Sequence, residues 1–299
     1  QRAVRGGGVT RVSDEECAEM TVLRVAAVAA PFGRDLAECF DRIERLVASA
    51  RDRGVRLLVL PEAALGGYLA ALDGPADDLP PALRTDGPEI ARLARIAGDL
   101  VLCAGFAEDA GGRMYNGAVC VTGDGVLGTY RKVHQPLGEG LTYGSGTEFP
   151  VFDTPVGRLG MLICYDKAFP EAARSLALGG AEIVACLSAW PASRTAAATE
   201  LAEDRWSRRH ELFDRARALE NQLVWVSANQ AGTFGQLRFV CDARVVGPGG
   251  DVLAATGPEA GMAVAEVDVP GALANARRAM FHLRDRRPEL YAMSELEGV

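Results

Sequence analysis

The sequence predicts an α/β fold whose β-sheet is parallel or mixed and has a buried face. The chain has 299 residues, 48% of them hydrophobic and 24% charged, which are the proportions of an ordinary globular protein. Residues 21–60 follow the pattern strand, helix, strand, with a short crossover. Variants of this pattern recur along the chain without a linker-like break. We therefore expect a single domain over residues 21–299, preceded by a disordered or cloned extension over residues 1–20.

The first unit begins with an apolar strand over residues 21–30. A helix should follow, because Leu36, Phe40, Ile43, Val47 and Ala50 recur at spacings of three and four and so share one face. Gly54 ends this helix. Residues 55–60 are β-branched and leucine-rich, which predicts the second strand.

The later elements alternate in a similar way. Helices are predicted over residues 88–97 and 170–178, the second opened by a proline in its first turn, and a long amphipathic helix over 201–221. Strands are predicted over residues 100–106, 117–122, 160–164, 182–188, 223–228, 237–246 and 263–267. The small, polar stretch 191–198 reads as a surface loop or lid.

The overall charge excludes some functions. A formal net charge of −8 argues against nucleic-acid binding, which needs clustered positive charge. No apolar stretch approaches the roughly 18 residues needed to cross a bilayer, so no membrane partner is expected. The first twenty residues lack the apolar core of a signal peptide.

The cysteines and histidines argue against disulfides and metal sites. Seven widely spaced cysteines without a C-x-x-C pair suggest reduced thiols in a cytoplasmic protein. Three histidines without H-x-x-x-H spacing make a histidine-rich metal site improbable. We therefore expect neither a metal nor another cofactor.

Lysine is rare in this chain. Of 32 basic residues only Lys132 and Lys167 are lysines, and the rest are arginines. A sequence that uses arginine for its surface charge gives a retained lysine more weight as a functional candidate. We assign no role to Lys167.

Four segments place polar residues where predicted strands end. They carry Glu62 after Leu60–Pro61, Lys132 within residues 130–134, Cys164 at the end of residues 160–164, and Trp190 after residues 182–188. Because ligands bind at the carboxyl ends of strands in open α/β sheets, these four segments are expected to converge.

Taken together, these segments resemble the nitrilase superfamily of carbon–nitrogen hydrolases, over roughly residues 21–291. The motifs, in chain order, are LPE at 60–62, YRKVH at 130–134, ICYDKAFPEAAR at 163–174, RARALENQ at 215–222, SANQAG at 227–232, VVGPGGDVLA at 245–254 and DRRPELY at 285–291. The resemblance implies a four-layer α-β-β-α sandwich. It also implies a homodimer or larger homo-oligomer, with residues 169–178 and 276–291 at or near interfaces.

The resemblance further implies a catalytic triad of Glu62, Lys132 and Cys164, with Glu139 as a second glutamate that positions substrate and orients Lys132. A thiol is mostly protonated at neutral pH, so Cys164 needs a base, and Glu62 can take its proton. The Lys132 ammonium can stabilise an oxyanion, and the backbone N–H of Tyr165 is the natural second donor.

The Cys-Tyr-Asp motif at 164–166 most resembles the amidase and omega-amidase branches of this superfamily. This resemblance implies hydrolysis of a small primary amide to a carboxylic acid and ammonia, through a Cys164 thioester. Hydrolysis of N-carbamoyl compounds and then of nitriles are the alternatives, and from another class, a catalytically silent scaffold. Tyr68, Phe169 and Trp190 are candidate pocket walls.

Two further residues offer alternative roles. A Cys–His dyad with His134 is an alternative by residue type. If His134 and Lys132 lie on one strand they share a face, and His134 could instead be a hydrogen-bond partner of the site. Arg194 could bind a substrate carboxylate, although a solvated loop arginine is the better interpretation.

Overall fold

The computed structural model describes residues 22–74 and 78–292, and its centre is one mixed sheet of thirteen strands. The predicted extension over residues 1–20 lies outside the described residues. One half of the sheet runs in the order β6 (Gly125–Arg131), β5 (Met114–Thr122), β4 (Val101–Asp109), β2 (Leu57–Val59), β1 (Leu23–Ala30) and β15 (Gly261–Val267), with the short β3 (Ala82–Leu83) beside β4.

The other half runs in the order β7 (Val151–Thr154), β8 (Gly157–Ile163), β9 (Ile183–Ser188), β10 (Val224–Gln230), β13 (Arg244–Val246) and β14 (Val252–Ala255). Within residues 22–74 and 78–292, the strand pairing between the halves is confined to the ends of β1 and β10, which pair in parallel at Ala29 with Asn229 and Ala30 with Gln230. A separate hairpin is formed by β11 (Thr233–Phe234) and β12 (Leu237–Arg238).

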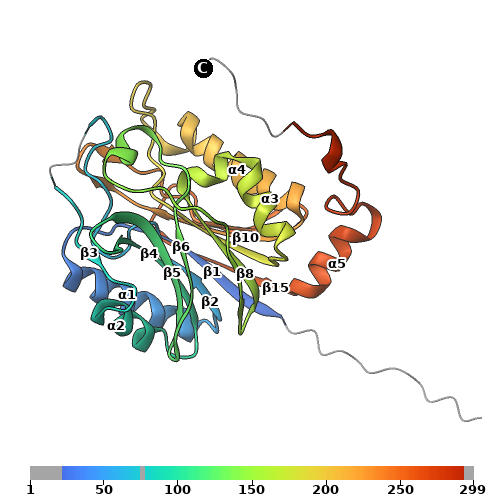
Figure 1. The fold of residues 1–299 in the computed structure, drawn as a ribbon, viewed down its shortest axis with the longest axis horizontal. Helices are drawn as coiled ribbons and strands as arrows, with labels where there is room; N and C mark the ends of the chain where they lie inside the picture. The colour runs from blue at the N-terminus through green and yellow to red at the C-terminus, as the bar shows by residue number, and fades with distance from the viewer. Residues whose placement is uncertain (1–21, 75–77, 293–299) are drawn as a thin grey trace, which may run out of the picture.

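Helices cover the outer face of each half (Figure 1). The helices α1 (Leu36–Asp52) and α2 (Pro88–Ala97) lie on the first half, and α3 (Pro170–Leu178) and α4 (Arg205–Asn221) on the second, with α5 (Val269–Ala279) at the periphery. This arrangement is the four-layer α-β-β-α sandwich, so the predicted fold class is confirmed. No helix among residues 22–74 and 78–292 has both the length and the apolar character needed to cross a membrane.

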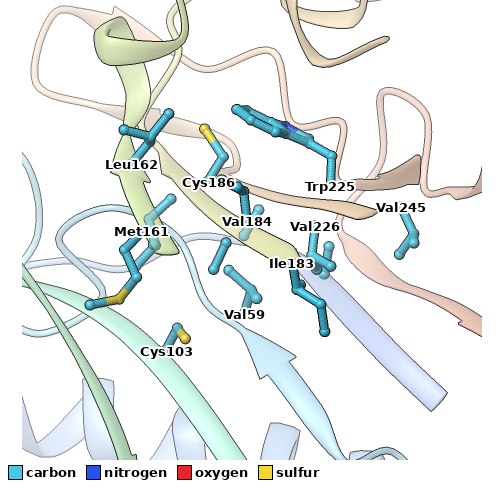
Figure 2. Packing of buried hydrophobic residues seen from close by; sticks show 14 of the residues in the cluster. Val59, Cys103, Met161, Leu162, Ile183, Val184, Cys186, Trp225, Val226 and Val245 are labelled. Carbon is cyan, nitrogen blue, oxygen red and sulfur yellow. The ribbon is translucent and has the colours of Figure 1, made fainter. Parts of the chain in front are cut away.

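The side chains of β1 alternate between two hydrophobic cores, one on each face of the strand. Successive strand residues point to opposite faces, so Val25, Ala27 and Ala29 belong to the core that includes the second half of the sheet. Ala26, Val28 and Ala30 belong to the core beneath α1 and α2. Figure 2 shows Val59 and Cys103 of the first half gathered with Met161, Ile183 and Val226 of the second.

The predicted apolar face of α1 packs as expected. Phe40, Ile43, Val47 and Ala50 are buried, and Leu36 is half-buried at the helix start. The Asp35 side chain caps the helix by accepting hydrogen bonds from the backbone N–H groups of Ala37 and Glu38.

Two predicted elements differ from the structure. The strand expected over residues 237–246 is broken into β12 and β13, because Cys241 and Asp242 have φ values of +61° and +42°, which a continuous strand does not permit. The helix expected from residue 201 starts at Arg205, where the Asp204 side chain caps it. Its inward face is also polar instead of apolar, with His210, Asp214, Arg217 and Asn221 all buried.

Candidate active site

The four predicted segments meet at one end of the sandwich, three of them contributing polar side chains and the fourth a backbone N–H group. Glu62 follows β2 after a short extension, Lys132 directly follows β6, Cys164 directly follows β8, and Ala189 directly follows β9. β4 passes close to the Glu62 backbone at Gly105, where a Cβ atom would lie 2.8 Å from Glu62 Cα. Only glycine permits this approach without displacing the glutamate.

Glu62, Lys132 and Glu139 form a fully buried group of ionisable side chains. Lys132 Nζ donates hydrogen bonds to Glu62 Oε1 at 2.8 Å and to the two Glu139 oxygens at 3.0 and 2.7 Å. All three side chains have no exposed surface. Bulk water does not reach the Lys132 ammonium, so the two carboxylates are its hydrogen-bond partners, and these charge-assisted hydrogen bonds fix its position.

Asn116 is a further member of this group that sequence reasoning missed. Its Nδ2 donates to Glu62 Oε1 and to Glu139 Oε1, both at 2.6 Å. The other Glu62 oxygen accepts a 2.6 Å hydrogen bond from the backbone N–H of Ala189. Asn116 lies on β5 at the edge of a predicted strand, so no local sequence signal distinguishes it from an ordinary strand residue.

The charges in this group shift one another's pKa values. Burial alone would lower the pKa of Lys132, but the Glu139 and Glu62 carboxylates outweigh it and hold that pKa well above its usual value. Burial raises the pKa of Glu139 to about 7, and the nearby Glu62 raises it while Lys132 opposes both. The lysine therefore stays an ammonium, whereas Glu139 titrates near neutral pH.

Cys164 lies at the sharp turn between β8 and a 3₁₀ helix over Cys164–Ala168. Its φ is +50°, in the left-handed region that a non-glycine residue rarely adopts. Burial raises the pKa of its thiol well above the usual value, and Glu62 raises it further, while Lys132 lowers it. The thiol is therefore protonated at rest and needs a base to become a nucleophile.

Asp166 holds this turn in place. Its carboxylate accepts hydrogen bonds from Ile163 N at 3.0 Å, Tyr130 Oη at 2.7 Å and His134 N at 3.0 Å, and it is fully buried. Sequence reasoning gave Asp166 no role, although its place two residues after Cys164 was a usable signal.

His134 does not form a dyad with the cysteine in this structure. Its Nδ1 lies 2.8 Å from Asp166 Oδ1, and its ring stacks on that of Phe169 with centroids 3.7 Å apart. β6 ends at Arg131, so Lys132 and His134 do not lie on one strand, and the condition for a shared strand face is not met. The histidine instead supports the turn that carries Cys164.

A cavity of about 230 Å³ opens beside Cys164. Three of the four predicted substrate contacts, Tyr68, Tyr165 and Trp190, line it, and so does Trp206, which sequence reasoning missed. Phe169 is not among its walls, because its ring lies against His134 and, edge to face, against Tyr165. Arg194, the suggested partner of a substrate carboxylate, is not among the cavity walls and forms an ion pair with Asp73.

Lys167 takes part in a second buried polar cluster, behind the cavity wall. Its Nζ donates to Asp214 Oδ1 at 2.8 Å, lies 2.8 Å from His210 Nδ1, and is 5.1 Å from the centre of the Trp190 ring. Burial, together with the Lys167 cation, lowers the pKa of His210 to about 3. The imidazole is therefore neutral and accepts the lysine's hydrogen bond, while its Nε2 faces the Asp242 carbonyl oxygen at 3.0 Å.

Comparison with known proteins places this chain among carbon–nitrogen hydrolases. The family model described as carbon-nitrogen hydrolase matches residues 24–276. An (R)-stereoselective amidase of Pseudomonas sp. is 34% identical over 261 residues, which cover 85% of this chain and 88% of the amidase. Further relatives carry the names nitrilase, N-carbamoylputrescine amidase and omega-amidase.

Solved structures agree with this similarity. A carbon-nitrogen hydrolase from Helicobacter pylori G27 has a TM-score of 0.76 at 26% identity, covering 90% of this chain and 97% of that one. A mutant amidase from Nesterenkonia sp. AN1 has a TM-score of 0.72 at 25% identity, covering 90% and 95%. That structure carries the acetamide moiety of fluoroacetamide covalently added at its active-site cysteine.

Proposed function

This chain belongs to the carbon–nitrogen hydrolase family, the nitrilase superfamily, and we propose that it hydrolyses a small primary amide to a carboxylic acid and ammonia. The observation that carries the proposal is the buried contact between Glu62 and Lys132 beside a cavity lined by Cys164. These groups supply a base, a cation and a nucleophile, which are the three things that acyl transfer from an amide requires.

Acylation begins when Cys164 Sγ attacks the amide carbon and Glu62 takes the thiol proton. A base is needed because the pKa of this thiol is raised well above its usual value. The carbonyl π electrons move onto oxygen, where the Lys132 ammonium and the Tyr165 backbone N–H stabilise the oxyanion. Losing one such donor typically costs on the order of 3 kcal/mol of transition-state stabilisation.

Collapse of this intermediate breaks the carbon–nitrogen bond. The leaving nitrogen takes the proton back from Glu62 and departs as ammonia, which leaves a thioester on Cys164. Glu62 then takes a proton from water as the water oxygen attacks the thioester carbon. The carbon–sulfur bond breaks, the sulfur regains a proton, and the carboxylic acid leaves. Glu139 acts on this sequence through Lys132, which it positions.

The test is an ammonia-release assay over aliphatic amides, N-carbamoyl compounds and nitriles. Cys164→Ala should abolish ammonia release. The control is Cys39→Ala, which replaces a buried cysteine of α1 outside the candidate active site and should retain ammonia release. Intact-mass analysis should detect an acyl adduct that is absent from Cys164→Ala.

Three outcomes of this assay contradict the proposal. Carbon dioxide evolved with ammonia from N-carbamoyl compounds, in preference to amides, indicates a carbamoyl hydrolase. Preferential turnover of nitriles indicates a nitrilase. No turnover of any of these compounds indicates a catalytically silent scaffold.

We also propose that the chain forms a homodimer or larger homo-oligomer through residues 169–178 and 276–291. These segments expose large apolar side chains, including Leu178, Met280 and Leu290, which are 53%, 64% and 69% exposed. Sedimentation velocity at micromolar concentration should give a species of at least twice the chain mass. A monomer under these conditions contradicts the proposal.

A further inference from the structure

We infer that the substrate is an uncharged monocarboxamide with an apolar acyl group about as large as one six-membered ring. This inference rests on the proposed amidase function and adds the substrate class to it. It is carried by the walls of the cavity beside Cys164, by the pairing of the charges around it, and by its volume.

The walls of the cavity are aromatic and aliphatic. Four rings, those of Tyr68, Tyr165, Trp190 and Trp206, contribute to it, and Leu72, Leu137 and two prolines complete most of the remainder. No charged side chain lines it among the residues that the structure describes. An acyl group with a carboxylate or an ammonium would lose its hydration here without gaining a counter-ion, which is strongly unfavourable.

The nearby charges are already paired. Lys132 is held by Glu62 and Glu139, so its positive charge is balanced by buried carboxylates before any substrate binds. In the loop that follows the Trp190 wall, Arg194 pairs with Asp73. Arg205, at the start of α4, donates to the hydroxyl groups of Ser193 and Thr195 in that loop. A substrate carboxylate would have to break one of these interactions to obtain a cationic partner.

The volume favours a small acyl group. About 230 Å³ is less than the roughly 300–1,000 Å³ of pockets that hold drug-sized ligands. A cavity of about 150 Å³ lined by apolar side chains is enough for benzene. The space therefore fits one ring, or a branched chain of similar size, together with the carboxamide group.

The two tryptophan walls are held in place before substrate binds. Trp190 Nε1 donates to the Trp206 carbonyl oxygen at 3.1 Å, and Trp190 N donates to Asn229 Oδ1 at 2.8 Å. The buried Asp204 side chain accepts from Trp206 N at 2.8 Å and from Ser193 N at 3.1 Å. Preformed walls favour a ligand of matching shape, because little side-chain ordering is required on binding.

The experiment compares kcat/KM for an isosteric pair of amides, 4-methylpentanamide and succinamate, in which an isopropyl group replaces a carboxylate. Phenylacetamide, N-carbamoylputrescine, acetamide and propionamide complete the panel. We expect 4-methylpentanamide to exceed succinamate by about 100-fold or more, since the carboxylate would be desolvated without a partner. Phenylacetamide should exceed acetamide by about 10-fold or more, since the ring fills the cavity.

A variant tests the aromatic wall directly. Trp206→Ala should lower the ratio of kcat/KM for phenylacetamide to that for acetamide by about 10-fold. The control Leu212→Ala removes an exposed apolar side chain from the same helix and should leave this ratio within about 2-fold of the wild type.

The outcomes separate the two proposals. Succinamate or N-carbamoylputrescine turned over as well as 4-methylpentanamide overturns the inference about the acyl group. An unchanged ratio in Trp206→Ala overturns it as well. Absence of ammonia release from every amide, including acetamide and propionamide, overturns the amidase function itself.

Discussion

Lys132 Nζ hydrogen-bonds to both carboxylate oxygens of Glu139, at 3.0 and 2.7 Å, and neither side chain has any exposed surface. A buried ammonium is costly unless its donors are all satisfied. Glu139 supplies two acceptors, and Glu62 supplies another. Three acceptor oxygens around one nitrogen match the three donors of an ammonium better than the planar, larger guanidinium of arginine. This explains why a chain rich in arginine has a lysine here.

We expect Lys132→Arg to lose activity by about 100-fold or more. The planar guanidinium is larger than an ammonium and would displace Glu62 or Glu139, and its charge is delocalised over a rigid fork. The measurement is kcat/KM for ammonia release, with circular dichroism to show that the variant folds. Turnover close to that of the wild type would contradict this interpretation of Lys132.

We expect Glu139→Gln to reduce the pH dependence of stability. The pKa of Glu139 in the folded protein is about 7, above the value of about 4.3 for a free glutamate, so the folded state binds a proton more readily than the unfolded state. Stability from this group is full below about pH 4 and is lost as pH rises through about 7.

The check for Glu139 is Tm at about pH 5 and about pH 8. The fall in Tm over this interval should be smaller in Glu139→Gln than in the wild type, by on the order of 5 °C. The control Glu148→Gln neutralises an exposed carboxylate farther along the chain from Glu139. Its Tm should fall between these pH values by as much as the Tm of the wild type. Equal falls in Glu139→Gln and the wild type would show that Glu139 does not titrate in this range.

We expect Asp166→Asn to destabilise the fold by about 2–4 kcal/mol and to lower kcat, because an amide nitrogen would then face backbone N–H donors. Those donors, Ile163 N and His134 N, fix the turn of Cys164. Chemical denaturation and ammonia release measure the two effects. Asp153→Asn, with a side chain 93% exposed, is the control and should cost less than about 1 kcal/mol. An equally small effect at Asp166 would contradict its role.

We expect Lys167→Met to destabilise the fold by about 3–5 kcal/mol, because it leaves the Asp214 carboxylate buried without its closest cation. The Arg244 Nε atom is 3.9 Å from Asp214, too far for a hydrogen bond. Adding Asp214→Leu should restore part of the loss. Urea denaturation of the single and double variants measures the coupling, and additive losses would show that the pair does not interact.

The helix bounds were predictable where the chain itself marks them. α2 and α3 have the predicted ends, because each has a proline in its first turn and a glycine immediately after its last residue. The strand over residues 237–246 was mispredicted because every second residue from Leu237 to Val245 is apolar, and this alternation continues through Cys241 and Asp242. The backbone there turns to place Asp242 beside Arg244, and no local pattern records that pairing.

The site was predictable to the extent that its residues sit in recognisable motifs. Glu62, Lys132 and Cys164 each follow a strand, and the fold brings the segments together. Asn116 and Lys167 were missed as structural partners because their contacts are distant in sequence: Asn116 meets Glu62, 54 residues away, and Lys167 meets Asp214, 47 residues away. Only the three-dimensional structure brings such pairs together.

Both lysines of the chain have side chains with no exposed surface. Amine-acylating reagents should therefore leave these two side chains unmodified in the native state and reach them only in molecules that have opened. A lysine-specific endoprotease should likewise cut only such molecules. Because one lysine lies in the candidate active site and the other behind the cavity wall, the rates of acylation at the two positions report separately on local opening of each region.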